Sequence, residues 1–276
     1  MRERLRKLRH IALDLDGTIY TGGTVFKSTL PFLALLKGLG LGYTFLTNNS
    51  SKSAREYLAR LRSLGIEASP EQLYTSTQAT IEYLQQNGIG INRLFVLGTA
   101  SLQQELLEAG FTLSADDPRD EPDAVIAGFD TGLQFNRLCR AAYWIEQGKL
   151  FIATHPDLTC PTDERTVLVD CGSICAALEK ATGHQPDAVL GKPDPCMLRG
   201  ILRRHGLIPE DLAMVGDRLY TDMAMARATG ALGVLVLTGE TTPAAAAHSP
   251  QPDLIVSDLD ELGKQLESAR VSEGSS

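Results

Sequence analysis

Hydrophobic residues fall in short runs that alternate with amphipathic segments along the first part of the chain. Apolar runs occupy residues 11–16, 43–49 and 73–76, and the first two are followed by apolar residues at helical spacing in 28–40 and 51–65. Strands that alternate with helices in this way build a parallel sheet with helices on both faces. The pattern therefore predicts an α/β fold with a doubly wound parallel sheet.

The same alternation resumes near the end of the chain, after a long block with strands and helices of its own. Four further apolar runs lie at 187–193, 212–217, 233–239 and 253–258. Residues 80–184 contain three more apolar runs, three amphipathic segments and a polar loop at 114–123. We therefore predict two domains, a core of residues 1–79 and 185–276 and an inserted α/β domain of residues 80–184.

Composition and charge indicate a globular protein and argue against two classes of partner. The 276 residues are 43% hydrophobic and carry a net charge of -8, which disfavours nucleic acid and anionic membranes as partners. No apolar run approaches the roughly 20 residues that span a bilayer. The basic residues among 2–9 are expected to form a solvated, frayed terminus. The five cysteines match no disulfide or zinc spacing, so we expect a reduced, cytoplasmic protein.

Polar side chains stand where the predicted strands end. These residues are Asp14 and Asp16 after the first run, Thr47, Asn48 and Asn49 after the second, Lys192 after the inserted block, and Asp217 with Asp222 after the next. In a doubly wound sheet, ligands bind beyond the carboxyl ends of the strands. A threonine, a lysine and several aspartates are therefore expected to converge at one edge of the sheet.

The order of these motifs resembles the haloacid dehalogenase superfamily. They are DLDGT at 14–18, GKP at 191–193 and GDRLYTD at 216–222, with Thr47 after the second strand. The segments LTNNSSKS (46–53), ATHPDLTCPT (153–162), VGDRLYTD (215–222) and VLTGETT (236–242) resemble its NagD/p-nitrophenyl phosphatase subfamily. The resemblance implies a Rossmann-like core with an α/β cap inserted after the third core strand, in agreement with the block at 80–184.

The spacing of the two aspartates suits phosphoryl transfer. Residues i and i+2 of a strand point to the same side, about 6–7 Å apart, so a phosphoryl group fits between Asp14 and Asp16. The resemblance assigns Asp14 as the nucleophile that forms an aspartyl-phosphate and Asp16 as the general acid and then base. An ionised Asp nucleophile needs no separate base. Gly17 permits a sharp turn beside them.

A divalent cation and a lysine are expected to offset the repulsion between the carboxylates and the phosphate. The resemblance implies Mg²⁺, held by Asp14, the backbone carbonyl of Asp16 and Asp217. It implies that Asp222 orients these ligands and that Lys192 supplies a fixed positive charge. Hydrogen bonds to phosphate oxygens are expected from Thr47 and Asn48, and the neighbouring Asn49 is a further phosphate-binding candidate.

Simpler interpretations of the same residues stay open. Asp14 and Asp16 could only cap a strand end, Lys192 could lie in a surface turn, and Asp222 could be the N-cap of a helix at 223–230. His155 and Asp157, in the loop 153–162, suit a surface turn as well as a substrate contact. His155 stands where members of the resembled subfamily commonly carry Asn.

These observations predict a magnesium-dependent phosphatase acting on a small phosphorylated metabolite, such as a sugar phosphate, phosphoglycolate or a nucleotide, with p-nitrophenyl phosphate as a generic substrate. The inserted block is expected to select the substrate, although it could instead stabilise the fold or form the interface of a homodimer. A phosphotransferase or phosphomutase would use the same aspartyl-phosphate, and the fold could also serve as a non-catalytic, ligand-binding regulatory module. Phosphate release from an aryl ester separates hydrolysis from these, and metal dependence excludes a dehalogenase.

Overall fold

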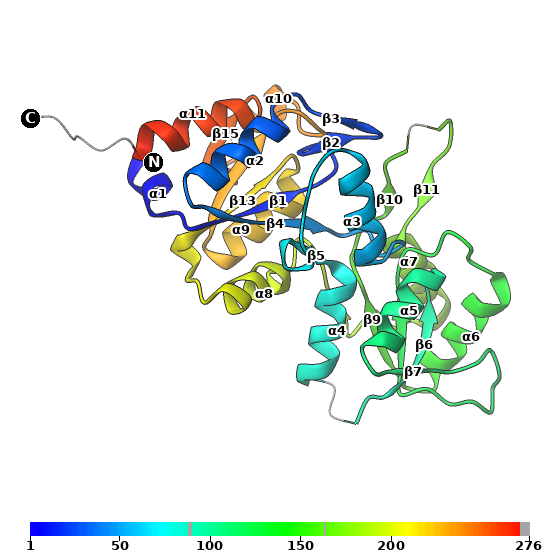
Figure 1. The fold of residues 1–276 in the computed structure, drawn as a ribbon. Helices are drawn as coiled ribbons and strands as arrows, with labels where there is room; N and C mark the ends of the chain where they lie inside the picture. The colour runs from blue at the N-terminus through cyan, green and yellow to red at the C-terminus, as the bar shows by residue number, and fades with distance from the viewer. Residues whose placement is uncertain (88–89, 163, 271–276) are drawn as a thin grey trace, which may run out of the picture. The chain divides into compact units, whose positions relative to one another are not determined.

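The computed structural model describes residues 1–87, 90–162 and 164–270, which form two compact units. Unit 1 contains Met1–Leu46, Leu58–Tyr74 and the residues from Pro193 onward, and unit 2 contains Thr47–Tyr57 and Thr75–Lys192. Each unit has its own parallel sheet with flanking helices (Figure 1). The predicted α/β fold is therefore confirmed. No helix in the described ranges has the length and apolarity needed to cross a bilayer.

Unit 1 is built on a six-stranded sheet in the order β15-β14-β13-β1-β4-β5. Its strands are β1 (His10–Asp14), β4 (Gly42–Thr47), β5 (Leu73–Thr75), β13 (Leu212–Gly216), β14 (Leu232–Val236) and β15 (Leu254–Val256). Helices α2 (Thr29–Gly38) and α11 (Leu259–Arg270) lie on one side of the sheet, and α8 (Cys196–His205) and α9 (Ala224–Thr229) lie on the other (Figure 1). The remaining elements are short: α1 (Arg2–Lys7), the hairpin β2 (Tyr20–Thr21) and β3 (Thr24–Val25), η1 (Pro70–Gln72), η2 (Pro209–Asp211), η3 (Leu219–Met223) and α10 (Pro243–Ala247). Helix α3 (Ala54–Ser63) contains residues of both units.

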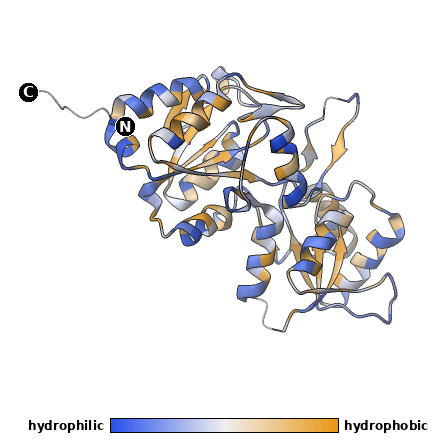
Figure 2. Cartoon of the chain, viewed as in Figure 1, coloured by the Kyte–Doolittle hydropathy of each residue, from blue (hydrophilic) through white to orange (hydrophobic). Residues whose placement is uncertain are grey.

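The central strands of unit 1 are buried on both faces, as their continuous apolar sequences predict. All five residues of β1 are buried, and so are all five of β13. These strands are among the hydrophobic segments in Figure 2. The parallel register pairs Asp14 with Leu46 and Leu13 with Val215, so β1, β4 and β13 end at the same edge of the sheet. Side chains that follow these strands are therefore neighbours.

Unit 2 has a five-stranded sheet in the order β12-β9-β8-β6-β7. Its strands are β6 (Arg93–Leu97), β7 (Thr112–Leu113), β8 (Ala124–Ala127), β9 (Leu150–Ala153) and β12 (Ala188–Val189), with a separate hairpin of β10 (Thr159–Cys160) and β11 (Leu168–Val169). Its helices are α4 (Ser76–Asn87), α5 (Ala100–Glu108), α6 (Phe135–Glu146) and α7 (Cys171–Thr182).

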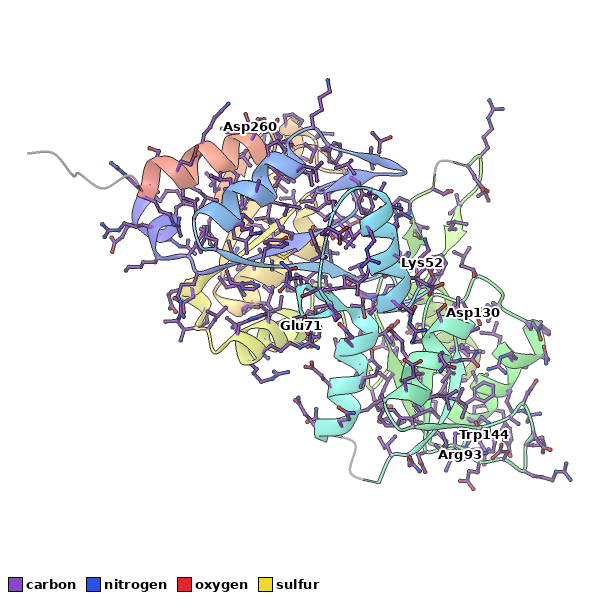
Figure 3. All side chains as sticks on the ribbon, in the orientation of Figure 1. Lys52, Glu71, Arg93, Asp130, Trp144 and Asp260 are labelled. Atoms are coloured by element: carbon purple, nitrogen blue, oxygen red, sulfur yellow. The ribbon has the colours of Figure 1, made fainter. Side chains whose placement is uncertain are left out.

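Alternate residues of the unit 2 strands form one hydrophobic cluster with α6 and α7. Phe95, Val125 and Phe151 belong to it, together with Trp144 of α6, which is 3% exposed (Figure 3). Burial of each such large side chain contributes roughly 1.5–3 kcal/mol. Unit 2 therefore has a core of its own.

One expectation from the sequence is wrong for the segment that ends unit 2. Residues 187–193 were expected to contain a strand of the core, but Ala188–Val189 pair with β9 in the unit 2 sheet. An apolar run shows that a segment is buried, whereas its partner strand is decided by tertiary packing.

The basic N-terminal segment is a docked helix rather than a frayed end. Leu5 and Leu8 are 2% and 3% exposed. The Arg270 guanidinium donates hydrogen bonds to the carbonyl oxygens of Leu5 and Leu8, both at 2.6 Å. Leu5 in α1, Leu8 directly after it and the Arg270 cation at the carboxyl end of the helix hold α1 in place, as helix amphipathicity and the helix dipole favour.

Candidate active site

Three aspartates meet at the carboxyl edge of the unit 1 sheet. Asp14 ends β1, Asp217 directly follows β13, and Asp222 lies in the next turn. One carboxylate oxygen of each lies within 4.8 Å of the others. Their exposed fractions are 7%, 2% and 0%. We call these three residues the carboxylate cluster.

Asp217 is held by backbone groups that approach it closely. The Glu240 N–H donates to Asp217 Oδ2 at 2.6 Å, and the Thr241 N–H donates to the Asp217 carbonyl oxygen at 3.2 Å. Gly17, with φ +89°, and Gly239 both lie so close that a Cβ at either position would overlap the Asp217 carboxylate. A side chain at either position would therefore displace this carboxylate.

Asp222 belongs to the carboxylate cluster and does not cap a helix. Its Oδ2 accepts the Arg218 N–H at 3.1 Å, and the residue lies in the π-helical turn η3. Helix α9 begins at Ala224, with Met223 at its N-cap position and no side-chain cap. The alternative interpretation of Asp222 as the N-cap of that helix is therefore wrong.

The charges around the cluster favour a cation. Burial by itself would lower the pKa of Arg218, but the charges of Tyr220 and Glu240, and then those of Asp14 and Asp217, raise it. Arg218 Nε forms an ion pair with Glu240 Oε2 at 2.9 Å. Three buried carboxylates are the hard oxygen donors that Mg²⁺ or Ca²⁺ prefers, so this donor set fits a divalent cation. The Asp16 side chain is exposed and lies outside the cluster.

The other predicted phosphate-site residues gather within unit 2. Asn48 Nδ2 donates to the Lys192 carbonyl oxygen at 2.9 Å, and the Lys192 N–H donates to Asn48 Oδ1 at 2.7 Å. Asn48 Nδ2 also lies 3.1 Å from Asp157 Oδ2. Thr47, Asn48 and Lys192 are all less than 10% exposed. The Asn48 carboxamide therefore fixes the backbone that carries Lys192 and orients Asp157.

Close packing at Gly191 permits this arrangement. Gly191 has φ +74°, and a Cβ there would lie 2.8 Å from Asn48 Oδ1 and 2.9 Å from the Thr154 carbonyl oxygen. Beside it, the Asn49 N–H donates to Thr47 Oγ1 at 3.2 Å. The Gly-Lys-Pro segment is thus a tight, buried turn, and Lys192 is not a surface residue.

His155 lies inside unit 2, with both ring nitrogens occupied. It is 0% exposed; Nδ1 lies 2.9 Å from Thr154 Oγ1, and Nε2 lies 2.9 Å from Asp170 Oδ1. A carboxylate oxygen of Asp157 lies within 4.8 Å of a ring nitrogen of His155 and of a carboxylate oxygen of Asp170. The geometry thus makes His155 a support for the loop that carries Asp157, and excludes a plain surface turn.

Asp170 is a residue that the sequence did not reveal. It is 2% exposed, and it caps α7 by accepting the Cys171 N–H at 2.6 Å. The only signal for it was its place just before a helical segment, which is typical of an N-cap. Its bond to His155 joins residues 15 positions apart, and a single sequence does not reveal such a pairing.

His155 and Cys171 shift each other's pKa in opposite directions. Burial by itself would lower the pKa of His155, but Cys171 and then Asp170 raise it from 6.5 to about 9. Burial by itself would raise the pKa of Cys171, but hydrogen bonds and the charge of His155 lower it from 9 to about 6. Between pH 6.5 and 9 the proton that folded His155 keeps is therefore offset by the proton that folded Cys171 has released, and we expect the free energy of unfolding to change little from this pair.

Urea unfolding at about pH 6.5 and at about pH 9 tests this balance. The wild type and His184→Gln, at an exposed position, should each lose less than about 1 kcal/mol of unfolding free energy between the two pH values. A larger loss in the wild type would contradict the pairing of His155 with Cys171.

The chain is similar to known phosphatases along most of its length. The profile of the haloacid dehalogenase-like hydrolase family matches residues 11–112, and a HAD-hydrolase-like profile matches residues 189–262. The acid sugar phosphatase of Staphylococcus aureus is 32% identical over 238 residues, which cover 86% of this chain and 90% of that protein.

Solved structures agree with these matches. The 4-nitrophenylphosphatase of Thermotoga maritima superimposes with a TM-score of 0.89 at 38% identity, covering 95% of this chain and 98% of that one. The glycerol phosphate phosphatase of Mycobacterium tuberculosis, solved in complex with magnesium, has a TM-score of 0.88 at 32% identity, covering 97% of this chain and 81% of that one.

Proposed function

From the premise that this chain belongs to the haloacid dehalogenase-like hydrolases, in their NagD/p-nitrophenyl phosphatase subfamily, we propose a magnesium-dependent phosphatase that cleaves a small phosphorylated metabolite through an aspartyl-phosphate. It is a phosphoric monoester hydrolase, as its relatives are. The observation that carries the mechanistic proposal is the buried cluster of Asp14, Asp217 and Asp222. Three carboxylates brought together out of water need a cation.

The aspartates act in two steps. An Asp14 carboxylate oxygen attacks the phosphorus while the bond from phosphorus to the ester oxygen breaks, and Asp16 gives its proton to that oxygen. Asp16, now ionised, takes a proton from water, whose oxygen attacks the phosphorus and releases inorganic phosphate and the Asp14 carboxylate. The exposure of the Asp16 side chain supports this role, since a group that shuttles protons must meet both the leaving group and water.

The remaining residues stabilise the transferring phosphoryl group. We assign Lys192 as its fixed positive charge, and Thr47 and Asn48 as hydrogen-bond donors to its oxygens. Asn49 adjoins them as a further candidate. Asp14, the Asp16 carbonyl and Asp217 would hold Mg²⁺, and the bound ion would supply positive charge to the phosphoryl oxygens. The glycerol phosphate phosphatase solved with magnesium supports this choice of ion.

Phosphate release tests this function directly. We expect the purified protein with magnesium to release inorganic phosphate from p-nitrophenyl phosphate and from small sugar or polyol phosphates. Transfer of the phosphoryl group to a second metabolite, with no free phosphate, would contradict hydrolysis.

A reducing, cytoplasmic setting suits the five cysteines, none of which is joined in a disulfide.

Asp16→Asn should affect esters according to their leaving groups. An aryl oxygen leaves readily without a proton, whereas an alkyl oxygen needs one. We expect kcat/KM for an alkyl phosphate to fall at least about 10-fold more than for p-nitrophenyl phosphate, within the 10²–10⁴-fold range typical of general acid catalysis. Equal losses at the first chemical step, measured by rapid quench, would contradict Asp16 as the acid.

We propose that unit 2 acts as a cap in which Asp157 contacts the leaving group and His155 positions it. Asp157 is half-buried, and Asn48 Nδ2 orients its Oδ2. We expect Asp157→Asn and Asp157→Ala to change the ranking of natural esters by kcat/KM at least about 10-fold, since a site that hydrogen-bonds a substrate group discriminates strongly. His155→Ala should produce the same change through loss of its support for the loop.

A panel of phosphate esters measures this selectivity. Asp130→Asn, in the same unit (Figure 3), is the matched control and should keep the wild-type ranking. Turnover of the small aryl phosphate should change little in every variant. An unchanged ranking in both Asp157 variants would show that residues other than Asp157 determine the substrate specificity.

A further inference from the structure

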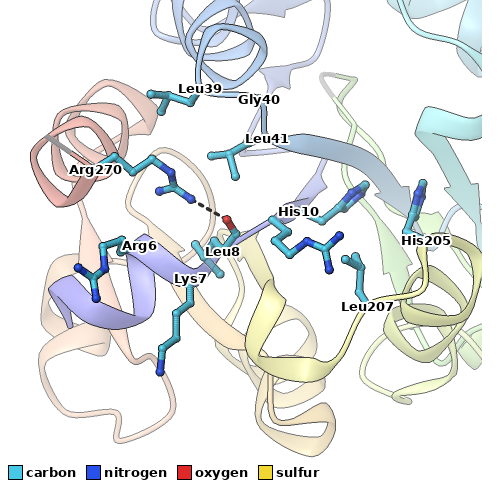
Figure 4. A pocket seen from close by; sticks show the side chains of 11 residues that line it. Arg6, Lys7, Leu8, His10, Leu39, Gly40, Leu41, His205, Leu207 and Arg270 are labelled. Atoms are coloured by element: carbon cyan, nitrogen blue, oxygen red, sulfur yellow. Dashed lines mark hydrogen bonds between the residues drawn. The ribbon is translucent and has the colours of Figure 1, made fainter. Parts of the chain in front are cut away.

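Unit 1 contains a basic pocket that the proposed reaction does not use. Its volume is about 410 Å³, and four cations line it, Arg6, Lys7, Arg9 and Arg270 (Figure 4). It lies at the amino end of β1, which begins at His10, whereas the carboxylate cluster lies at the carboxyl end of the same strand. Four residue steps of about 3.3 Å separate the two ends by roughly 13 Å. The pocket and the cluster are therefore separate places in unit 1.

The lining has one sign of charge. No lining residue of this pocket is acidic, although the whole chain carries a net charge of -8. Three of the four cations come from the segment 6–9, which docks as described above. A concave surface lined by one sign of charge concentrates ions of the opposite sign.

Two of these cations have only weak partners, and one is committed to the fold. Lys7 pairs with Glu3 at 3.0 Å, with both side chains at least 60% exposed, and Arg9 lies 3.5 Å from Asp211 with 64% of its side chain exposed. Exposed ion pairs of this kind contribute about 0–1 kcal/mol, so an anion can replace them. Arg270 instead donates to the carbonyl oxygens of Leu5 and Leu8, so its guanidinium shapes the pocket.

The rest of the lining is apolar or uncharged. Leu39, Leu41 and Leu207 contribute hydrophobic surface. The rings of His10 and His205 are in contact, with their centroids 4.3 Å apart and their planes tilted by 32°. Burial lowers the pKa of His10 to about 4 and also lowers that of His205, so the arginines and Lys7 supply the positive charge at neutral pH.

We propose that this pocket binds a small polyphosphate anion, with its phosphates on Arg6, Lys7 and Arg9. One guanidinium group can donate two parallel hydrogen bonds to the oxygens of a phosphate. The volume of the pocket lies within the range of small-ligand sites. Inorganic pyrophosphate and a nucleoside diphosphate share this chemistry. They differ in whether an organic portion also covers the leucines.

A simpler explanation makes a different prediction. Cations at the carboxyl ends of α1 and α11 also complement the helix dipoles. If that were their whole role, reversing their charge would lower stability, and the wild type would bind no polyphosphate. Binding and stability therefore separate the two explanations.

Calorimetry with an inactive protein tests the proposal. In an Asp14→Asn background with chelator and 0.15 M salt, we expect pyrophosphate and ADP to bind and adenosine not to bind. Arg6→Glu/Arg9→Glu should weaken this binding at least 10-fold. Arg55→Glu, an 85% exposed arginine of unit 2 paired with Glu108 at 3.4 Å, is the matched control and should bind as the parent does.

Hydrogen exchange locates the bound anion. Pyrophosphate should protect amides in residues 5–10 and 205–208 in the parent but not in the double variant. Equal affinities for pyrophosphate and ADP would show that the pocket recognises the phosphates alone. Tighter binding of ADP would show that the leucines also contact the organic portion of the ligand. Both results support the proposal. Equal binding of adenosine, unchanged affinity in the double variant, or no binding to the parent would overturn it.

A second variant protects the test against misfolding. Should Arg6→Glu/Arg9→Glu fail to fold, Arg6→Ala, at an exposed position, replaces it, with an expected loss of affinity of at least 3-fold. Because no arm of the experiment requires catalysis, its result does not depend on the proposed hydrolytic function.

Discussion

Asp14→Asn is expected to abolish turnover while the protein stays folded. The carboxamide has nearly the same shape but cannot attack phosphorus as a carboxylate does, so kcat should fall by at least about 10³-fold, as when other enzymes lose their nucleophile. The same change removes one of three like charges that are at least 93% buried. Without metal, the variant should therefore melt at or above the wild-type temperature.

Two measurements separate a lost nucleophile from a lost fold. Phosphate release gives kcat, and calorimetry in chelator gives the melting temperature. Asp260→Asn, at a 59% exposed side chain of α11 (Figure 3), should match the wild type in both. More than trace turnover by Asp14→Asn would contradict the assignment of Asp14 as the nucleophile.

Removal of the divalent cation is expected to have an effect of similar size. Chelation should abolish phosphatase activity, and excess magnesium should restore it. Asp217→Ala should lower kcat/KM by at least about 10²-fold and raise the magnesium concentration for half-maximal activity at least about 10-fold, because it removes one of few protein ligands. Full activity in excess chelator would refute a metal-dependent mechanism.

A glycine variant tests the same site without removing a ligand. In Gly17→Ala, the new Cβ would overlap the Asp217 carboxylate and the backbone would be strained at φ +89°. We expect Gly17→Ala to need a higher magnesium concentration for half-maximal activity than the wild type needs. Gly23→Ala is the matched control, since a Cβ there meets no atom within 4 Å. Identical magnesium titrations for the two variants would show that the position of Asp217 does not control the ion.

The sequence predicts best where local pattern and burial coincide. The run at 11–16 lies in a parallel sheet, so its apolar residues are buried on both faces and its polar residues mark the strand end. The same reasoning found Asp217 after β13. Both assignments needed only that parallel strands present their carboxyl ends together.

Interactions between distant residues could not be predicted in this way. The pairing of Ala188–Val189 with β9 rather than with the core sheet depends on which edge is available to a short apolar segment. The burial of His155 depends on Asp170, and the docking of α1 depends on Arg270, 262 residues from the Leu8 carbonyl that it binds. No local pattern encodes these partners.

The interrupted sequence of unit 1 also determines when each part of the protein can fold during synthesis. Most of unit 2 is one continuous stretch, Thr75–Lys192, whereas β1 pairs with β13, a strand made about 200 residues later. On the ribosome, the nascent chain would therefore complete the inserted unit first, while the apolar strand that carries Asp14 waits with one edge unpaired. Such late, long-range pairing is slow and exposes the chain to aggregation. The carboxylate cluster can thus be assembled only after most of the polypeptide has emerged.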